Sequence, residues 1–345
     1  AYGSRKLISL KVNPYNSKIA FAQSPPPRKP IAANSVSKDE NLRIQADEAM
    51  KSGYFDRAIN LYKQALELNP ENPDANLNLA KTYKLNSDFK NAIPYFEKAC
   101  AQTPDDLELM TLLGECYKQN GDYTKAETQF KRVLNKEPAY DYAKRNLLDT
   151  QNLRLACFDP IKAYNERQKT ANENLRTAIS LASGFLPKDI VKKVQDVTVT
   201  FDKTAQMGGR SNIAQYEHAK RKISIQDEYT YASPVLTASY TVHEFIHAAD
   251  NDPYTSVREE QDAYRQQARF WEKNAKNVKD PEMDYVVDLY KQSAETLDKR
   301  VAEIYLLRDP GIPETSYNHP PGTKKAAASG LNSSASTLKA YDIIV

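Results

Sequence analysis

The chain has 345 residues, of which 40% are hydrophobic and 27% charged, so it is large enough for two or three globular units with cores of their own. Its 48 basic and 45 acidic residues leave a net charge of only +3, and no basic run is interleaved with aromatic residues. This balance argues against nucleic acid as a partner. No apolar run approaches the roughly 18 residues that cross a bilayer, so we expect no membrane partner either.

The cysteines are few and odd in number. Cys100, Cys116 and Cys157 all fall within helical patterns, which is typical of free thiols and not of a disulfide framework. Free thiols suit a reducing compartment, so we expect a cytoplasmic protein. No signal peptide is visible, but the chain starts at Ala1, and secretion therefore stays open as an alternative.

The two ends of the chain have compositions that are typical of flexible segments. Residues 1–38 contain the run Pro25-Pro26-Pro27 and show no sustained hydrophobic period. Alanine, serine, lysine and glycine dominate most of residues 321–345. We therefore expect a flexible leader and a flexible tail, with globular units between them.

A repeat of 34 residues follows the leader, marked by Pro70, Pro104 and Pro138. When these prolines are numbered position 32, small residues recur at positions 8 and 20, where the two helices of a repeat would approach closely. Those residues are Ala46, Ala80 and Gly114 at position 8, and Ala58, Ala92 and Ala126 at position 20. Bulky residues recur at position 24 as Tyr62, Phe96 and Phe130.

This pattern resembles the tetratricopeptide repeat (TPR) family over residues 39–138. The resemblance implies an α-solenoid of three helix pairs whose concave face binds proteins or peptides. A further helical pattern from Asp141 to about Asn152 is predicted to cap the array. We therefore place the TPR domain at residues 39–152.

The ligand of this array is not specified by the sequence. Chaperone-binding members of the family hold a peptide carboxylate with amide and basic side chains. Asn78 fits one of these positions. The residues that stand where an amide and two basic groups would be required are Asp47, Glu108 and Leu112. Two roles stay open, which are the binding of an unspecified protein or peptide and the bracing of the next domain.

A change of hydrophobic period after about residue 195 predicts a small β-sheet. Val199 and Phe201 alternate with threonines, as in a half-buried strand. Two further alternating segments, 212–217 and 222–226, are predicted to form a hairpin. Such a hairpin either offers an edge to an extended substrate or only covers the next helix.

The most informative motif is His243-Glu244-Phe245-Ile246-His247, which has the spacing HExxH. It lies in an apolar segment that begins at Pro234 and is typical of a buried helix. Because positions i and i+4 share one face of a helix, the two imidazoles can hold one Zn²⁺. Glu244 is then placed to take a proton from water. The alternative is a buried helix whose histidines only form hydrogen bonds in the core.

A catalytic zinc site normally has a third protein ligand, and three glutamates compete for this role. Ser256 and Glu259 have the spacing of a capping box, which explains Glu259 by local structure. Glu260 falls on the apolar arc of the same predicted helix, where a carboxylate needs a positive partner, either zinc or an arginine. Glu303 lies on a helix predicted to start after Pro281 and points away from its apolar stripe. The predicted zinc ligands are therefore His243, His247 and Glu260.

Tyrosines and the remaining histidines offer further candidates. Tyr264, one turn after the third predicted ligand, is predicted to stabilise the oxyanion of the reaction, with Tyr254 and Tyr305 as alternatives. We interpret His218 and His319 as structural, although His319 is a ligand in principle.

The residues from His243 to Asp250 and the Glu-x-x-Ala segment at 260–263 resemble the glutamate-zincins, including the lethal-factor-like peptidases. The resemblance implies a zincin-like domain, placed at 153–320, that hydrolyses a polypeptide substrate with Zn²⁺ as cofactor. We therefore expect a predominantly helical α+β chain, in which a TPR solenoid precedes a zincin-like domain with a small β-sheet. The competing interpretation is a TPR scaffold or adaptor whose zincin-like domain is inactive.

Overall fold

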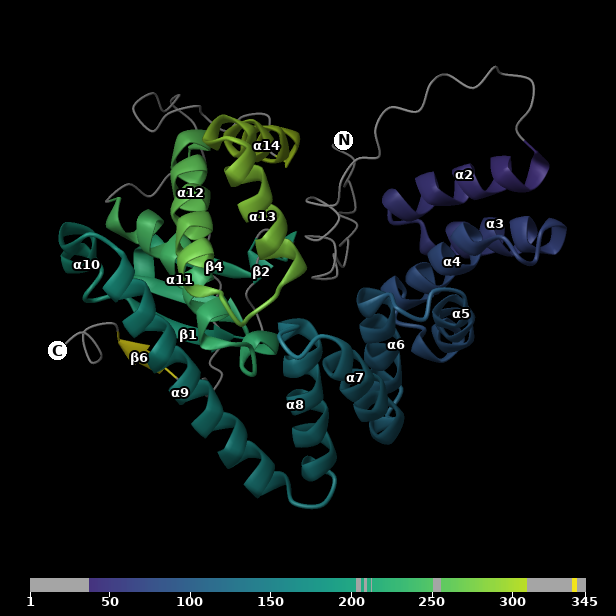
Figure 1. Cartoon of the computed structure of the whole chain (residues 1–345), viewed down its shortest axis with the longest axis horizontal. Coiled ribbons are helices and arrows are strands. Elements are labelled where there is room, and N and C mark those ends of the chain that lie inside the picture. The colour runs from purple at the N-terminus through teal and green to yellow at the C-terminus, as the bar shows by residue number, and fades with distance from the viewer. Residues whose placement is uncertain are drawn as a thin grey trace, which may run out of the picture. The chain divides into compact units, whose positions relative to one another are not determined.

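The computed structural model describes residues 37–202, 206–207, 210–211, 213–250, 256–308 and 337–339. Over these residues the chain is predominantly helical and contains a small β-sheet, as predicted (Figure 1). Its contacts divide it into two compact units. Among the described residues, the first unit holds 37–138 and 146–154, and the second holds 139–145 and the residues from 155 onward. The predicted flexible leader and tail lie almost wholly outside the described residues.

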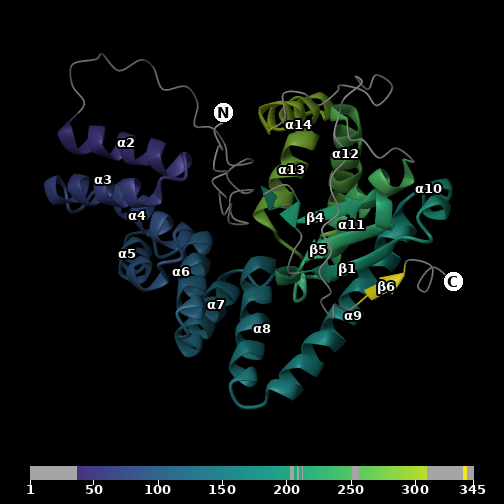
Figure 2. The same cartoon turned by 180° about the vertical axis from the view of Figure 1, so that it is seen from behind.

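The first unit is an array of helix pairs with the predicted period (Figure 2). Its helices are α2 (Lys38–Lys51), α3 (Phe55–Leu68), α4 (Pro73–Leu85), α5 (Phe89–Gln102), α6 (Leu107–Gln119) and α7 (Tyr123–Lys136). The alanines at positions 8 and 20 are all 0% exposed, so they do lie where paired helices meet. At Gly114 the approach is closer still, because a Cβ built there would lie 2.6 Å from Cε1 of Phe130.

The turn within each helix pair repeats as well. Gly53, Ser87 and Gly121 stand 34 residues apart and have φ values of 76°, 61° and 85°. Glycine adopts this left-handed conformation freely, whereas Ser87 adopts it at a cost. Asn72 and Asp106 then begin the next pair, because each side chain accepts a hydrogen bond from an N–H group in the first turn.

Helix α8 (Asp141–Ala156) is longer than the predicted capping helix and contributes residues to both units. In the first unit, Nζ of Lys118 donates to Oδ1 of Asn146 (2.7 Å) and to Asp149 (2.9 Å). In the second unit, the N–H of Asp141 donates to the carbonyl of Lys279 (2.9 Å). The predicted boundary at residue 152 therefore does not coincide with either edge of this helix.

The second unit consists of helices packed around a sheet of strand order β4-β5-β1-β6. Its helices are α9 (Pro160–Phe185), α10 (Lys188–Lys193), α11 (Pro234–Ala249), α12 (Val257–Asn274), α13 (Pro281–Gln292) and α14 (Ala294–Arg308). Its strands are β1 (Thr198–Asp202), β2 (Gln206–Met207), β3 (Arg210–Ser211), β4 (Ala214–Glu217), β5 (Lys222–Gln226) and β6 (Thr337–Lys339). Strands β1 and β5 are parallel, and β4 pairs with β5 in the antiparallel direction, so the predicted hairpin is present.

The core of this unit lies between the sheet and two helices. Ile223 and Ile225 of β5 are fully buried together with Val199 of β1, and α9 packs against α11 beside them (Figure 1). The other face of β1 is also buried at Thr200 and Asp202, and the Asp202 carboxylate accepts hydrogen bonds there from Lys222 (2.6 Å) and from two hydroxyl groups. The simple alternation predicted for β1 therefore gives way to a strand that is covered on both faces.

One predicted element is wrong in its extent. The single helix expected after Pro281 is two helices, α13 and α14, separated by Ser293. Ser293 has an extended backbone (φ −170°, ψ 154°), and its Oγ accepts the N–H of Thr296 (3.0 Å). The serine thus caps a new helix, although the apolar stripe continues across it.

No helix in the described part of the chain is long and apolar enough to cross a membrane.

Candidate metal centre

Helix α11 carries the HExxH motif and begins at Pro234, as predicted. The Oγ of Ser233 accepts the N–H of Val235 (3.3 Å) and so caps the first turn. The N–H of Ser233 itself donates to the carboxylate of Asp141 (2.7 Å). Most of the helix is buried, with Phe245 fully so, which agrees with its apolar sequence. The motif is therefore held on a buried helix with a capped first turn.

Helix α12 follows and separates the two adjacent glutamates in the predicted way. The Oγ of Ser256 accepts the N–H of Glu259 (3.2 Å), while Oε2 of Glu259 accepts the N–H of Ser256 (2.6 Å). This is the predicted capping box. Glu260 is left facing the interior and is only 6% exposed.

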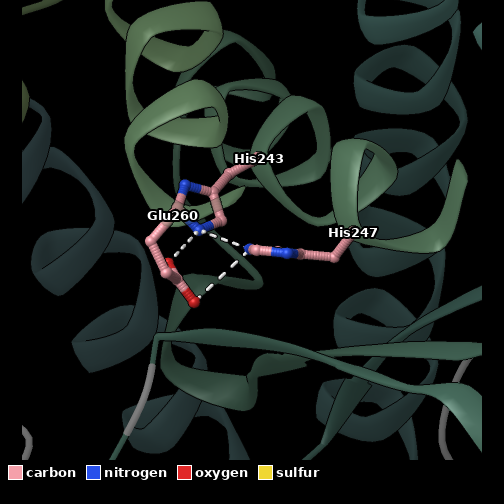
Figure 3. A group of neighbouring side chains, drawn as sticks. All are labelled: His243, His247 and Glu260. Atoms are coloured by element: carbon pink, nitrogen blue, oxygen red, sulfur yellow. Dashed lines mark hydrogen bonds and ion pairs between the residues drawn. The ribbon is translucent and has the colours of Figure 1, made fainter. Parts of the chain in front are cut away.

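Three side chains from these two helices converge on one point (Figure 3). Nε2 of His243 lies 3.2 Å from Nε2 of His247 and 3.3 Å from Oε2 of Glu260. Nε2 of His247 lies 3.6 Å from Oε1 of Glu260. The rival Glu303 is exposed and pairs with Arg300 (3.3 Å). The structure thus brings together the three predicted ligands and keeps the rival apart.

The geometry of this group fits a zinc ion. Zinc bonds to nitrogen and oxygen of about 2.0–2.1 Å in a tetrahedral site place neighbouring ligand atoms about 3.3 Å apart. The three separations above lie close to that value. Oε2 of Glu260 is buried and, among the described residues, has no polar partner outside this group, as expected for an oxygen that binds a metal. Nδ1 of His243 also lacks such a partner, although second-shell oxygens usually hold this atom in zinc sites.

Electrostatics within the group favour the charged forms of Glu260 and His247 when no metal is bound. Burial alone would raise the pKa of Glu260, but His247 and His243 outweigh burial and hold this pKa well below its usual range. Burial alone would lower the pKa of His247, but Glu260 raises it to about 9. Because zinc binds neutral imidazole, metal binding would release the proton of His247.

Glu244 lies beside the group without being part of it. Burial raises the pKa of Glu244, against the opposing effect of His243 and His247. The backbone N–H of Tyr216 in strand β4 donates a hydrogen bond to its carboxylate. Strand β4 ends the sheet, and its other edge pairs with no strand in the described ranges. A buried carboxylate therefore accepts an N–H group of the strand at the edge of the sheet.

The remaining candidates have different surroundings. The ring of Tyr264 packs edge-on against the ring of His243, with centroids 4.6 Å apart, and its role at an oxyanion stays a prediction. Tyr305 is half-buried on α14. His218 begins a short 3-10 helix, η1 (His218–Lys220), and does not belong to the metal-ligand group. Tyr254 and His319 lie outside the described residues.

Two contributors to this site were not predicted, Asp141 and Tyr216. The carboxylate of Asp141 accepts the N–H of Ser233, which lies 92 residues later in the chain at the start of α11. Tyr216 acts on Glu244 through its backbone, which any residue type would supply. Neither contribution leaves a local sequence pattern that identifies it.

Comparison with known proteins adds information on the first unit. Family models described as tetratricopeptide repeat match residues 45–106 and 84–147. No curated protein matches the chain. The predicted zincin-like domain has no counterpart in these family matches and stays a prediction.

Among solved structures, the chain is similar to the first TPR of Spaghetti (RPAP3) bound to an HSP90 peptide, with 22% identity and a TM-score of 0.32, over 35% of this chain and 96% of that chain. It is similar to the Sgt2 TPR domain from Aspergillus fumigatus, with 24% identity and a TM-score of 0.31, over 37% of this chain and 87% of that chain. It is also similar to MamA from Desulfovibrio magneticus RS-1, with 19% identity and a TM-score of 0.33, over 37% of this chain and 73% of that chain. Together with the 34-residue period, the family matches establish that residues 45–147 form a tetratricopeptide repeat array, a protein-interaction module.

Proposed function

We propose that this chain is a TPR protein whose second unit is a zinc-dependent peptidase. The observation that carries the proposal is the convergence of His243, His247 and Glu260 at separations that suit zinc, with Glu244 beside them. Two imidazoles and a carboxylate with one position left open are the ligand set of a catalytic zinc, whereas structural sites are closed by a fourth protein ligand. No fourth ligand joins the group within the described residues.

Each residue then has a defined part in the reaction. His243 and His247 would bind the metal as neutral imidazoles, and Glu260 as a carboxylate. Zinc, when bound, would supply the Lewis acidity that makes water a nucleophile near neutral pH. Glu244 would accept the proton of the attacking water and return it to the leaving amine.

Strand β4 supports a polypeptide as the substrate. An extended peptide can add to a free strand edge through main-chain hydrogen bonds. Since Tyr216 of β4 donates to Glu244, a peptide on that edge would lie next to the proposed base. Tyr264 is proposed to stabilise the oxyanion, on the ground that its ring already contacts the ring of His243.

The second candidate is a TPR scaffold or adaptor with an inactive second unit. The comparisons support this candidate better than they support hydrolysis, because the family models match only residues 45–147. In addition, Phe158 and Ile161 of the second unit are 84% and 74% exposed, and neighbouring exposed apolar side chains are typical of protein-contact surfaces.

The metal content of purified protein tests the site. After dialysis against metal-free buffer, we expect about one zinc per chain by elemental mass spectrometry, as for a site with three protein ligands. His247→Ala should remove the metal, and Glu260→Gln should weaken its binding. Glu303→Gln is the matched control and should retain it. Equal zinc in all four proteins, or loss only in the Glu303 variant, would contradict the ligand assignment.

A further inference from the structure

Arg221 occupies the turn between β4 and β5 in a conformation that disfavours its residue type. Its backbone is left-handed, with φ 50° and ψ 49°. In the described part of the chain, Ser87 is the only other non-glycine residue with positive φ. Glycine would adopt this conformation without strain, so the backbone alone does not account for an arginine here. The side chain supplies the reason.

The guanidinium of Arg221 connects three elements. Its Nη1 donates to the backbone carbonyl of Ala248 in the last turn of α11 (2.9 Å) and to the hydroxyl of Tyr216 in β4 (3.0 Å). Its Nε and Nη2 donate to both carboxylate oxygens of Asp196, before β1, at 3.0 and 2.5 Å. Nη2 also donates to the carbonyl of Lys193 at the end of α10 (2.5 Å). A planar guanidinium fixes the directions of all these bonds at once.

Two of these contacts lie next to the proposed catalytic groups. Ala248 directly follows His247, and Tyr216 is the residue whose backbone N–H donates to Glu244. Arg221 therefore holds both the strand that contacts Glu244 and the helix that carries Glu244. An increase in the separation of β4 and α11 would stretch the bond from Tyr216 to Glu244.

We propose that Arg221 is a positioning residue that sets the separation of strand β4 from helix α11 and so orients the Glu244 carboxylate through the N–H of Tyr216. Its effect on hydrolysis rests on the proposed peptidase function, whereas its effect on the Tyr216 hydrogen bond does not. A lysine could not take its place, because an ammonium group has a single nitrogen and cannot donate from three separate positions in one fixed plane.

Hydrogen–deuterium exchange at the Tyr216 amide, with zinc content and peptide hydrolysis measured in parallel, tests this proposal. In Arg221→Gln and Arg221→Lys, Tyr216 should exchange about 10–100-fold faster, as expected when a hydrogen bond to a charged group is lost. Zinc content should not change, and kcat should fall by more than KM rises. Arg221→Gly relieves the backbone strain and should show the same fast exchange even if the glutamine variant folds poorly.

The matched control is Arg265→Gln, which breaks another two-bond pair of an arginine with an aspartate, Asp298, elsewhere in the second unit. It should leave Tyr216 exchange and kcat at wild-type values. Wild-type exchange at Tyr216 in a folded Arg221→Gly protein would overturn the proposal. If no variant or wild-type protein cleaves any peptide, the peptidase function fails, but the exchange result still decides the role of Arg221.

Discussion

The TPR array and the second unit, which carries the candidate metal centre, are held together by different kinds of contact. In the array, each helix meets its neighbours in sequence, and side-chain pairs such as Asn78 with Asp47 join residues only 31 positions apart. Around the metal centre, Ser233 depends on Asp141, 92 residues away, and Glu244 depends on a separate strand. Because each repeat contacts only its neighbouring repeats, a substitution in the array should affect mainly the repeats next to it. The metal centre instead requires several non-repeated contacts at once.

The largest expected effect lies at the centre of the second unit. Glu244→Gln keeps the size of the side chain but removes the base, so peptide hydrolysis should fall about 10²–10⁴-fold while zinc content and folding stay nearly unchanged. New peptide termini in a denatured proteome incubated with each protein, detected by mass spectrometry, measure this loss. Termini that appear equally with both proteins would favour the scaffold candidate, in which the array is the functional half.

A second effect concerns pH in chelator-treated protein. The pKa of His247 is about 9 in the folded state and 6.5 without its surroundings, because Glu260 favours the cation more than burial disfavours it. The resulting stabilisation is complete below a pH of about 6.5 and is lost as the pH rises through about 9, by ~3 kcal/mol in total.

Denaturant unfolding at about pH 6 and about pH 10, followed by fluorescence, measures this loss. Trp271, the single tryptophan of the chain, lies in α12 and reports on the second unit. His247→Ala should abolish the pH step. A step of the same size in that variant would show that another group is responsible, and that the histidine is not coupled to Glu260.

A third prediction tests whether a substitution in the array changes the stability of the array alone. Gly114→Ala should destabilise the array by about 1–3 kcal/mol through the clash with Phe130, although alanine stands at the same position of the other repeats. Gly184→Ala in α9 is the matched control, since a Cβ there meets nothing within 4 Å. It should stabilise the second unit by about 0.5–1 kcal/mol. Urea unfolding by circular dichroism and by Trp271 fluorescence separates the two outcomes.

The smallest effect uses the repeated turn. Ser87→Gly should stabilise the array by about 0.5 kcal/mol, because relief of the left-handed backbone exceeds the added freedom of the unfolded chain. The reverse exchange at the equivalent position, Gly53→Ser, should lower the free energy of unfolding by a similar amount. Changes of the same sign in both variants would mean that the two turns are not equivalent.

Much of the candidate site could be predicted because helical geometry is local. The spacing of His243 and His247 places them on one face, and a capping box accounts for Glu259 and leaves Glu260 on the interior arc. The same reasoning kept Glu303 out of the group. The sequence did not predict the helix cap at Ser293, because the apolar stripe continues across this residue.

The sequence by itself determined the TPR array, the shared helical face of His243 and His247, and the interior position of Glu260 on the next helix, because these follow from periods of 34 and 3.6 residues. Only the tertiary structure decided that the three predicted ligands meet, that Asp141 accepts the N–H of Ser233 before α11, that Tyr216 donates to Glu244 and that Arg221 donates to Tyr216. These contacts join backbone groups and side chains from separate elements. Backbone N–H and carbonyl groups are the same in nearly every residue, so their choice of partner becomes visible only when the elements have packed.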